Sequence, residues 1–584
     1  MDIKFIQRVL PILGWLPNYK LYNLKGDLIA GITVGIVLIP QGMAYAMLAG
    51  LEPIHGLYAS TIPLILYAVF GTSRHLSVGP DAIVSLLTVA GIAALNTSGA
   101  EEYLLYVLTL TFLVGIIRLA MGVFRLGFVV KFLSNPVING FTSAAAIIIG
   151  LSQLKHLLRI NLPNSKHIQE VVMAIFLYIE EIHWLTLGIG VLGILIIKYG
   201  KKVHSTFPGS LVAVILGIAL VKIFNLTEQG ILIVGEVPGG LPGLVMPSFD
   251  FYVWERLFPI ALTIALVGFA QSFAIAKTIQ ARHKNYRLDA DQELVGLGMA
   301  NLGASFFQGY SVSGGFSRTA VNDNAGANTP LSSIITALLI ILTLLFFTGI
   351  FYHLPNAVLA AVVLSAVAGL IDFKEPMQLW KKDRADFFML ISTFIATLTL
   401  GIEIGIITGM GLSLLMVIYK ASRPHMAQLG RVPGTNIFRN INRFDQLEIF
   451  EDLLMVRIDG PIYFANVEYI KDKLDKWMGR RKGKIKMVIF DMESVTSLDS
   501  TGAQAVKTWI LDWRSQDIDV CLTGTKGPVR DVLNRWELIE CIGADHMFMD
   551  DQTAVEFYGK KMDGEGLKIH AAYATQSNIK KPPD

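Results

Sequence analysis

Long apolar runs, separated by short polar or basic breaks, fill the chain from Asp27 to about Tyr419. Runs such as Leu331 to Ile350 carry almost no charge over the length of a bilayer, and roughly 20 such residues are typical of a membrane-spanning helix. Divided at glycine, proline and charged residues, the pattern predicts about fourteen spans. After Lys420 the pattern becomes that of a soluble domain. We therefore expect a polytopic α-helical membrane domain over 26–420, preceded by a cytoplasmic segment over 1–25.

Composition agrees with this division. Of 584 residues, 53% are hydrophobic and only 16% are charged, whereas soluble domains carry about 25% charged residues. The formal net charge of +3 is too small to indicate a nucleic-acid partner. The only two cysteines, Cys521 and Cys541, lie in the C-terminal segment. This argues against a disulfide framework and is typical of a reducing compartment.

Basic residues accumulate in alternate loops, all on one side of the membrane. They are Lys4, Arg8, Lys20 and Lys25 before the first span, then Arg125 and Lys131, Lys198 to Lys202, Lys277 to Arg287, and Lys374 to Arg384. The positive-inside rule makes this side cytoplasmic, with the loop around Lys155 to Lys166 as an exception. An even number of spans then places both termini inside the cell, at the plasma membrane. No cleavable signal peptide is expected, because polar and basic residues continue to Lys25.

The membrane segment contains a weak internal repeat. Thr33 and Gln41 of the first span match Thr263 and Gln271 of the eighth at an offset of 230 residues (263 minus 33, and 271 minus 41). A polar break at Ser77 has a partner at Ser313, at an offset of 236. Two breaks in corresponding positions of two halves point to a transporter's binding site. Seven spans per half require the halves to be inverted; chance similarity among small and apolar residues is the alternative.

The two breaks, 77–81 and 309–319, each precede a helical run and so present a helix N-terminus at membrane depth. Irregular backbone is tolerated there only where it is buried or lines a cavity. Helix N-termini carry free N–H groups and a partial positive charge, so two facing ends would bind a small anion. The predicted lining comprises Gly79, Pro80, Asp81, Ser313, Gly314, Gly315, Phe316, Ser317 and Arg318.

Arg318 is the most informative of these residues, because a charge at membrane depth is seldom incidental. It is expected either to attract the anion or to pair with Asp81 on the other break, and the two roles can coexist. Asp81 would repel an anion unless Arg318 neutralises it, it turns away, or it takes up a proton that travels with the substrate. Gln41 and Tyr45 lie one helical turn apart and share a face; they would wall the site or simply pack against other helices.

Several motifs resemble the sulfate permease family of anion transporters. They are Pro40-Gln-Gly-Met-Ala-Tyr45, Ser77-Val-Gly-Pro80, the run from Gln308 to Asn322 with Ser317-Arg318-Thr319, and Leu498-Asp-Ser-Thr-Gly502. The resemblance covers nearly the whole chain in family order. It implies two inverted seven-span repeats arranged as core and gate domains, a site between the N-termini of spans three and ten, a homodimer, and elevator-like secondary active transport.

The resemblance leaves the substrate open: sulfate is the first expectation, with bicarbonate, chloride or dicarboxylate exchange, or an anion channel, as alternatives. No enzyme, metal or cofactor is expected, apart from H⁺ or Na⁺ as a coupling ion. Proton-coupled relatives tend to carry a glutamate where this chain has Gln271. Because an amide cannot titrate, Asp81 is the candidate that would replace it.

The C-terminal segment has the strand and helix alternation of an α/β domain. Its Asp499-Ser500-Thr501-Gly502 turn resembles that of STAS domains, in whose bacterial anti-sigma-factor antagonists a serine is phosphorylated. Ser500 is therefore either a regulatory phosphorylation site or simply a helix N-cap. We expect a linker over 421–450, a STAS domain over 451–562 that could bind a cytoplasmic protein, and a disordered tail over 563–584.

Overall fold

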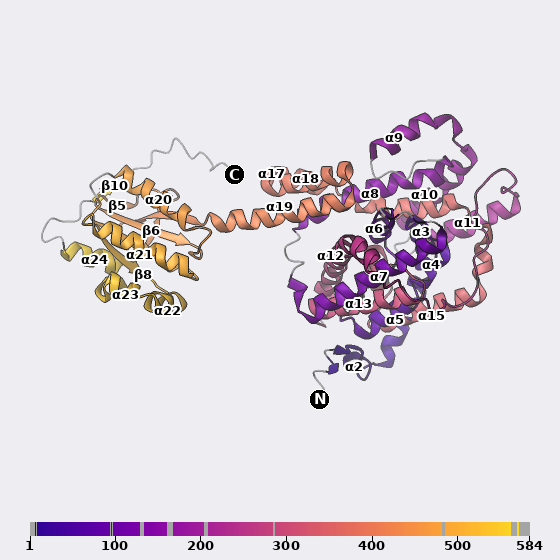
Figure 1. Ribbon diagram of the computed structural model, residues 1–584, viewed down its shortest axis with the longest axis horizontal. Coiled ribbons are helices and arrows are strands. Elements are labelled where there is room, and N and C mark those ends of the chain that lie inside the picture. Colours follow the sequence, from indigo (N-terminus) through magenta and orange to yellow (C-terminus); the bar gives the residue numbers. More distant parts are fainter. Residues whose placement is uncertain are drawn as a thin grey trace. The chain divides into compact units, whose positions relative to one another are not determined.

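The computed structural model describes residues 6–7, 9–93, 95, 97, 99–128, 134–160, 168–203, 208–283, 286–481, 485–561 and 569–571. The chain divides into two compact units, Met1–Ser413 and Leu414–Asp584. Figure 1 labels their helices and strands. The first unit is almost wholly helical, and the second combines a sheet with helices, so the fold class expected from the sequence is confirmed.

The first half of the membrane unit begins with α2 and ends with α11. Its elements are α2 (Ile12–Trp15), α3 (Leu21–Leu48), α4 (Pro53–Tyr58), α5 (Ile62–Phe70), β1 (Val78–Gly79), α6 (Ala82–Ile92), α7 (Ala100–Val123), α8 (Asn135–Leu158), α9 (Ile168–Leu177), η2 (Ile179–Glu181), α10 (Trp184–Val203) and α11 (Gly209–Ile223). The successive predicted spans are α3, α4 with α5, α6, α7, α8, α10 and α11.

The second half repeats this order from α12 onward. Its elements are α12 (Phe251–His283), α13 (Ala290–Phe306), β2 (Ser313–Gly314), α14 (Phe316–Asn324), α15 (Leu331–Phe346), η3 (Thr348–His353), α16 (Asn356–Val367), η4 (Ala368–Leu370), α17 (Lys374–Lys382), α18 (Arg384–Leu400) and α19 (Ile402–Ser422). Thr33 and Thr263 each donate a hydrogen bond to the carbonyl four residues earlier, Ile29 and Pro259. Matched residues of α3 and α12 thus have matched local structure.

Helix packing separates the expected core and gate. In the core, α13 packs on α5 and α7, α12 packs on α6 and α7, and α3 packs on α14 and α15. In the gate, α8 packs on α16 and α18, and α10 packs on α11 and α16. The two groups meet where α3 contacts α11 and α16, and where α6 contacts α8. Each group therefore combines helices from both repeats.

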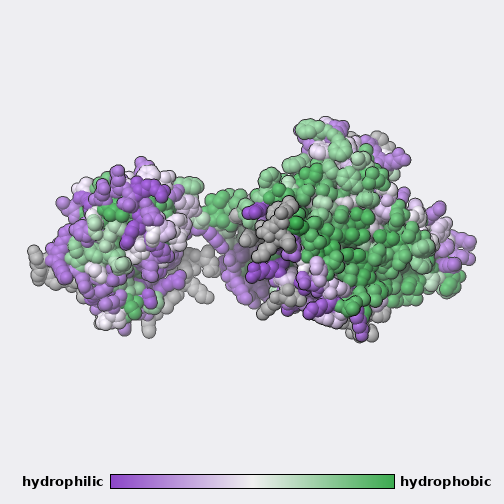
Figure 2. All heavy atoms as spheres, turned by 90° about the horizontal axis from the view of Figure 1, so that it is seen from below, coloured by the Kyte–Doolittle hydropathy of each residue, from purple (hydrophilic) through white to green (hydrophobic). Residues whose placement is uncertain are grey.

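The surface of the membrane unit is suited to lipid. Among the described residues, seven helical segments are long and apolar enough to cross a membrane, and four shorter apolar helices accompany them. Figure 2 shows large hydrophobic areas over these helices, whereas the surface of Leu414–Asp584 is mostly hydrophilic. Exposed leucine, isoleucine and phenylalanine side chains on α10, α15 and α19 contribute to the hydrophobic area.

The second unit is built on an eight-stranded mixed sheet ordered β10-β5-β3-β6-β7-β8-β9, with β4 paired to β3. The strands are β3 (His425–Arg431), β4 (Phe438–Asn440), β5 (Glu448–Phe450), β6 (Leu453–Asp459), β7 (Met487–Asp491), β8 (Asp519–Thr523), β9 (Met547–Phe548) and β10 (Ile569–Ala571). The helices are α20 (Val467–Arg480), α21 (Ser500–Arg514), α22 (Gly527–Arg535), α23 (Leu538–Ile542) and α24 (Asp551–Lys561), with the short turn η5 (Ala544–His546). β6, β7, β8 and β9 are parallel, as strands joined by helical crossovers are.

Two boundary predictions need correction. The segment 421–450 is not a linker, because β3 pairs with β6 inside the sheet and β4 and β5 extend it. These strands are short and interrupted by turns, so their alternation is weak in the sequence. Of the tail 563–584, the structure describes only Ile569–Ala571, which pairs with Phe450–Glu448 of β5; the rest of the tail prediction lies outside the described residues.

Candidate functional site

The two predicted breaks meet in the core domain. β1 and β2 form an antiparallel pair in which Val78 lies opposite Gly314 and Gly79 opposite Ser313. The amide of Gly315 donates to the Ser77 carbonyl at 3.1 Å. α6 and α14 begin directly after these strands. The pairing satisfies backbone groups that would otherwise be unpaired at membrane depth, and it brings two helix N-termini together.

The helix caps correct the register of the repeat. Asp81 and Gly315 are the N-cap residues of α6 and α14. Ser85 and Thr319 occupy matching positions, since each hydroxyl donates to its own N-cap carbonyl four residues earlier, at 2.7 and 2.8 Å. The offset at the breaks is therefore 234 residues (315 minus 81, and 319 minus 85), not 236. Ser77 corresponds to Ser311 rather than to Ser313. The sequence alone does not distinguish these two serines.

Arg318 lies folded against both breaks. A Cβ added at Gly315 would stand 2.6 Å from the guanidinium carbon, and one added at Gly79 would stand 3.7 Å from its Nη2. The side chain is buried, and its Nε and Nη2 have no hydrogen-bond partner. Because buried guanidinium groups normally find acceptors, these two nitrogens have unused capacity for an anion. A side chain at position 315 would displace the guanidinium group from this place.

Asp81 does not pair with Arg318. Within the described residues no ion pair joins them; instead, one Asp81 oxygen accepts from the backbone N–H of Ile83 at 3.2 Å and so caps α6. Both carboxylate oxygens also lie 3.4 Å from Nε2 of Gln271 on α12. Of the three possibilities that the sequence left open for Asp81, neutralisation by a salt bridge to Arg318 is absent here.

Other donors and acceptors at the breaks form a buried polar frame. The Gly314 amide donates to Oγ of Ser272 at 2.8 Å, and the Ser77 amide donates to Oγ1 of Thr319 at 3.1 Å. By contrast, Oγ of Ser313 is buried without a partner. Sequence reasoning missed Ser272 and Thr319, although both lie beside predicted site residues. They hold the backbone, whereas Ser313 remains free to donate.

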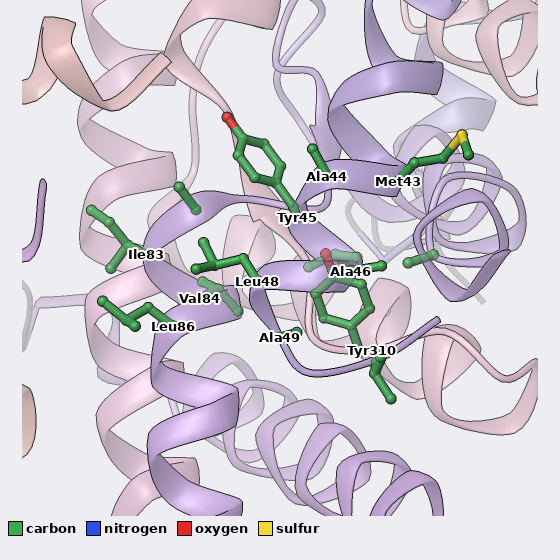
Figure 3. Packing of buried hydrophobic residues seen from close by; sticks show 14 of the residues in the cluster. Met43, Ala44, Tyr45, Ala46, Leu48, Ala49, Ile83, Val84, Leu86 and Tyr310 are labelled. Atoms are coloured by element: carbon green, nitrogen blue, oxygen red, sulfur yellow. The ribbon is translucent and has the colours of Figure 1, made fainter. Parts of the chain in front are cut away.

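Gln41 and Tyr45 are both buried on α3, and Oε1 of Gln41 has no partner. Figure 3 shows Tyr45 and Tyr310 among the apolar side chains of α3 and α6, including Ile83. The Tyr310 hydroxyl lies 3.2 Å from Oγ of Ser85 on α6. Sequence reasoning missed Tyr310, which lies inside the glycine-rich run that the resemblance singled out. The side chains of α3 thus form a wall of the site and also pack against other helices.

Two predicted lining residues stand apart from the buried group. Phe316 and Ser317 are exposed in the first turn of α14, while Arg318 and Thr319 after them are buried. Successive helical residues point in different directions, so a continuous run cannot all face one pocket. Pro80, like Gly79, is buried at the end of β1 before the α6 cap.

Arg118 on α7 is a second buried arginine beside the site. It donates from Nε to the Ala265 carbonyl at 3.2 Å, from Nη1 to Val312 at 2.9 Å and from Nη2 to Ile264 at 3.0 Å. Val312 directly precedes β2, so Arg118 ties that strand to α7 and α12. Sequence reasoning missed this residue; a lone charge within the apolar run of α7 was the signal.

A small cavity borders the site between core and gate. It has a volume of about 30 Å³ and is lined by Ile83 and Gln271 from the core, and by Phe141 of α8 and Ile406 of α19 from the gate, among others. A cavity of this size holds about one water molecule. It is therefore too small for a polyatomic anion.

One group of side chains resembles a metal centre by composition. His75, His283 and Asp323 bring ligand atoms within 4.8 Å of one another. However, the two imidazole rings stack with centroids 4.3 Å apart and an angle of 17° between planes, so their in-plane lone pairs do not converge. The His75 nitrogens face the Ala327 carbonyl and the Tyr286 hydroxyl. Within the group, His283 of α12 is hydrogen-bonded to Asp323 of α14 at 2.5 Å, and His75 stacks on His283.

The STAS-like turn also needs one correction. The N-cap of α21 is Asp499, whose Oδ1 accepts from the Gly502 amide at 2.7 Å and whose Oδ2 accepts from the Phe464 amide at 3.0 Å. Ser500 is the first helical residue and is exposed. The capping role considered for Ser500 is therefore wrong, because a carboxylate at the preceding position already fills it.

Comparison with known proteins agrees with this architecture. The model of the sulfate permease family matches residues 24–393, and that of the STAS domain matches 446–554. "Sulfate transporter 4.1, chloroplastic" from Arabidopsis thaliana is 39% identical over 573 residues, covering 95% of this chain and 83% of that protein. "Probable sulfate transporter 4.2" from the same plant is 39% identical over 571 residues, covering 94% and 84%.

Solved structures share the fold. The murine Solute Carrier 26 family member A9 anion transporter in the inward-facing state superposes with a TM-score of 0.88 at 25% identity, covering 95% of each chain. This likeness extends over both the membrane unit and the STAS domain. The two helix N-termini at the breaks and the buried arginine beside them agree with these matches. The chain therefore belongs to the sulfate permease family of anion transporters and is not an enzyme.

Proposed function

We propose that this protein carries sulfate across the membrane by secondary active transport. The observation that carries the proposal is Arg318, a buried guanidinium beside both breaks with two nitrogens that have no acceptor. Together with the unpartnered Ser313 hydroxyl and the two helix N-termini, it offers several donors to one small anion. Relatives named as sulfate transporters, at 39% identity, favour sulfate within this class.

The charge of the site bears on the choice of anion. Desolvating a dianion is far more unfavourable than desolvating a monoanion, so sulfate needs more compensation than bicarbonate or chloride. Arg318 and two helix ends supply it, and Asp81 opposes it when ionised. Uptake of a proton by Asp81 together with the anion would remove this opposition, which makes H⁺ the coupling ion that we favour over Na⁺.

Uptake of ³⁵S-sulfate into proteoliposomes tests the substrate. We expect saturable uptake that unlabelled sulfate abolishes and that bicarbonate, chloride and oxalate inhibit more weakly. Arg318→Gln should abolish uptake, whereas Lys277→Gln, which removes an exposed charge on α12, should retain it. Stronger inhibition by bicarbonate than by sulfate would overturn the sulfate assignment, and flux that neither saturates nor shows trans-stimulation would indicate a channel.

We further propose that transport proceeds by an elevator-like movement of core against gate. The roughly one-water cavity between α6, α12, α8 and α19 supports this, because an anion cannot pass there without separation of the two groups. Cysteines at Ile83 and Phe141, on opposite sides of that cavity, provide the test. The native Cys521 and Cys541 lie in the STAS unit and can be replaced first. Oxidative cross-linking should stop uptake and reduction should restore it; full uptake by the cross-linked protein would rule the movement out.

The membrane location, the oligomeric state and the orientation of the protein are also proposals. We propose a plasma-membrane homodimer with both termini in the cytoplasm; the basic residues in alternate loops support this orientation. A membrane-impermeant maleimide should label Cys541 only after permeabilisation, and labelling of intact cells would refute the orientation. Mass measurement of the detergent-solubilised protein checks the dimer.

Regulation through the STAS domain is also a proposal. Ser500 is exposed at the first position of α21, where a phosphate would meet the helix's positive end but also the charge of Asp499. Such a change could recruit or release a cytoplasmic protein partner. Mass spectrometry of protein from its native cells should find phosphate on Ser500 and not on the neighbouring exposed Thr501; unmodified Ser500 under all growth conditions would contradict it.

A further inference from the structure

A cavity on the predicted cytoplasmic side of the core lies under the N-terminal segment. It has a volume of about 220 Å³ and lies between α2, the turn after α5 and the start of α13. Gln292 holds this arrangement together, because its Nε2 donates to the carbonyls of Val9 and Phe70 at 3.2 and 2.8 Å. Pockets for drug-sized ligands span roughly 300–1,000 Å³, so this one suits a smaller group.

The cavity wall carries a net positive charge. Arg74 and Arg287 both line it, and neither forms an ion pair within the described part of the chain. The Arg74 guanidinium lies 5.5 Å from the centroid of the Tyr286 ring, which holds it in place. Asp289 also lines the cavity, but its Oδ1 accepts from the amides of Asp291 and Gln292 and thereby caps α13. Two arginine side chains therefore line the cavity together with one carboxylate, which already accepts hydrogen bonds from the start of α13.

A buried indole and an apolar rim complete the site. The Trp15 indole lines the cavity, is buried, and its N–H has no acceptor. Immediately after it in the chain, Leu16, Leu21 and Tyr22 are 48%, 83% and 75% exposed. Exposed apolar residues beside a cationic pocket are typical of a segment at the membrane interface, where anionic headgroups are concentrated.

We propose that this cavity binds a phosphate ester group, with Arg74 and Arg287 as its donors. Arginine suits this ligand because its planar fork matches phosphate oxygens. The group comes either from an anionic phospholipid headgroup or from a free phosphorylated solute, and the apolar rim favours the lipid. Bound phosphate would fix the N-terminal segment to the core at a point remote from the transport site.

The experiment compares the parent with variants of the full-length protein. All of them carry Arg318→Gln, so that phosphate bound at the transport site does not contribute. Phosphatidylglycerol in phosphatidylcholine nanodiscs is one probe, read by native mass spectrometry of retained lipid, and inorganic phosphate is the other, read by thermal shift. Arg74→Gln/Arg287→Gln should weaken binding at least about tenfold, since a single charge-assisted hydrogen bond contributes this much. Trp15→Phe, which keeps an aromatic ring at the cavity wall, should bind more nearly as the parent does.

The control variant Lys25→Gln/Lys277→Gln removes two exposed charges outside the cavity and should bind as the parent does. Variant-sensitive retention of phosphatidylglycerol identifies the lipid as the source, and variant-sensitive binding of inorganic phosphate alone identifies a free solute. Equal binding of both probes by parent, cavity variants and control would overturn the proposal.

Discussion

The side-chain amide of Gln271 on α12 lies 3.4 Å from both carboxylate oxygens of Asp81 at the start of α6. The two positions that the sequence marked as candidates for coupling are therefore neighbours, although 190 residues separate them. An amide that donates to a carboxylate stabilises its charge without itself titrating. A glutamate in place of Gln271 would face Asp81 as a second acid.

Asp81→Asn tests whether this carboxylate carries the coupling proton. Asparagine caps helices about as well as aspartate, so α6 should keep its start and the protein its fold. We expect sulfate uptake to persist but to lose its stimulation by an inwardly directed proton gradient. The measurement is proteoliposome uptake with and without the gradient. Unaltered gradient dependence in the variant would refute the role of Asp81.

Gln271→Glu should restore a second acid beside the first. Two unit charges about 4 Å apart repel by about 4 kcal/mol at an effective dielectric constant of about 20, so the pair retains a proton or excludes the anion. We expect uptake at neutral pH to fall about tenfold or more and to recover on acidification. Gln271→Met, which loses the amide without adding charge, should show no such recovery. A pH profile for the glutamate variant that matches wild type would contradict the expectation.

The spans, the breaks and the strand and helix alternation of the STAS domain could be predicted because each depends on local composition, whereas the strands β3, β4 and β5 were assigned to a linker. Contacts between distant residues could not: the sequence offered Asp81 a partner in Arg318, whereas the structure gives it Gln271. The register of the repeat was two residues wrong because Ser311 and Ser313 are equivalent by composition and only the caps distinguish them. Asp499 and Ser500 are likewise both good N-cap residues, and backbone geometry selects the former.

Arg118→Met tests whether the second buried arginine holds β2 in position. Its loss would remove one charged donor from each of the carbonyls of Val312, Ile264 and Ala265, and a hydrogen bond of this kind contributes about 1.5–3 kcal/mol. We expect a lower melting temperature and little uptake. Arg118→Lys should recover only part of the melting temperature and of the uptake, because an ammonium group cannot span three carbonyls. Melting and uptake equal to wild type in the methionine variant would show that the strand is held by other contacts.

Gly268→Ala offers an independent route to the same effect. The guanidinium of Arg118 packs directly on Gly268, with no room for a Cβ. An added methyl group should therefore displace Arg118 and mimic its loss, although the charge remains. Gly411→Ala, at a position with open space around it, is the matched control and should behave as wild type.

Asp551→Asn tests the pH dependence of the STAS domain. Burial raises the pKa of Asp551 from 3.8 to about 6, and Thr523 donates to its carboxylate. Because the folded pKa lies above the unfolded one, the folded domain binds more protons between these values. The contribution of this carboxyl group to stability is therefore fully present below about pH 4 and declines as the pH rises through about 6, by on the order of 3 kcal/mol.

The asparagine variant should abolish that decline and be the more stable protein at neutral pH. Hydrogen exchange of β8 and α24 in the full-length protein, followed across this pH range, measures the effect. Asp550→Asn, at the exposed neighbouring position that caps α24, changes the same charge and should keep the wild-type pH profile. If both variants lost the dependence, the cause would be the net charge at the start of α24 rather than the buried carboxyl group.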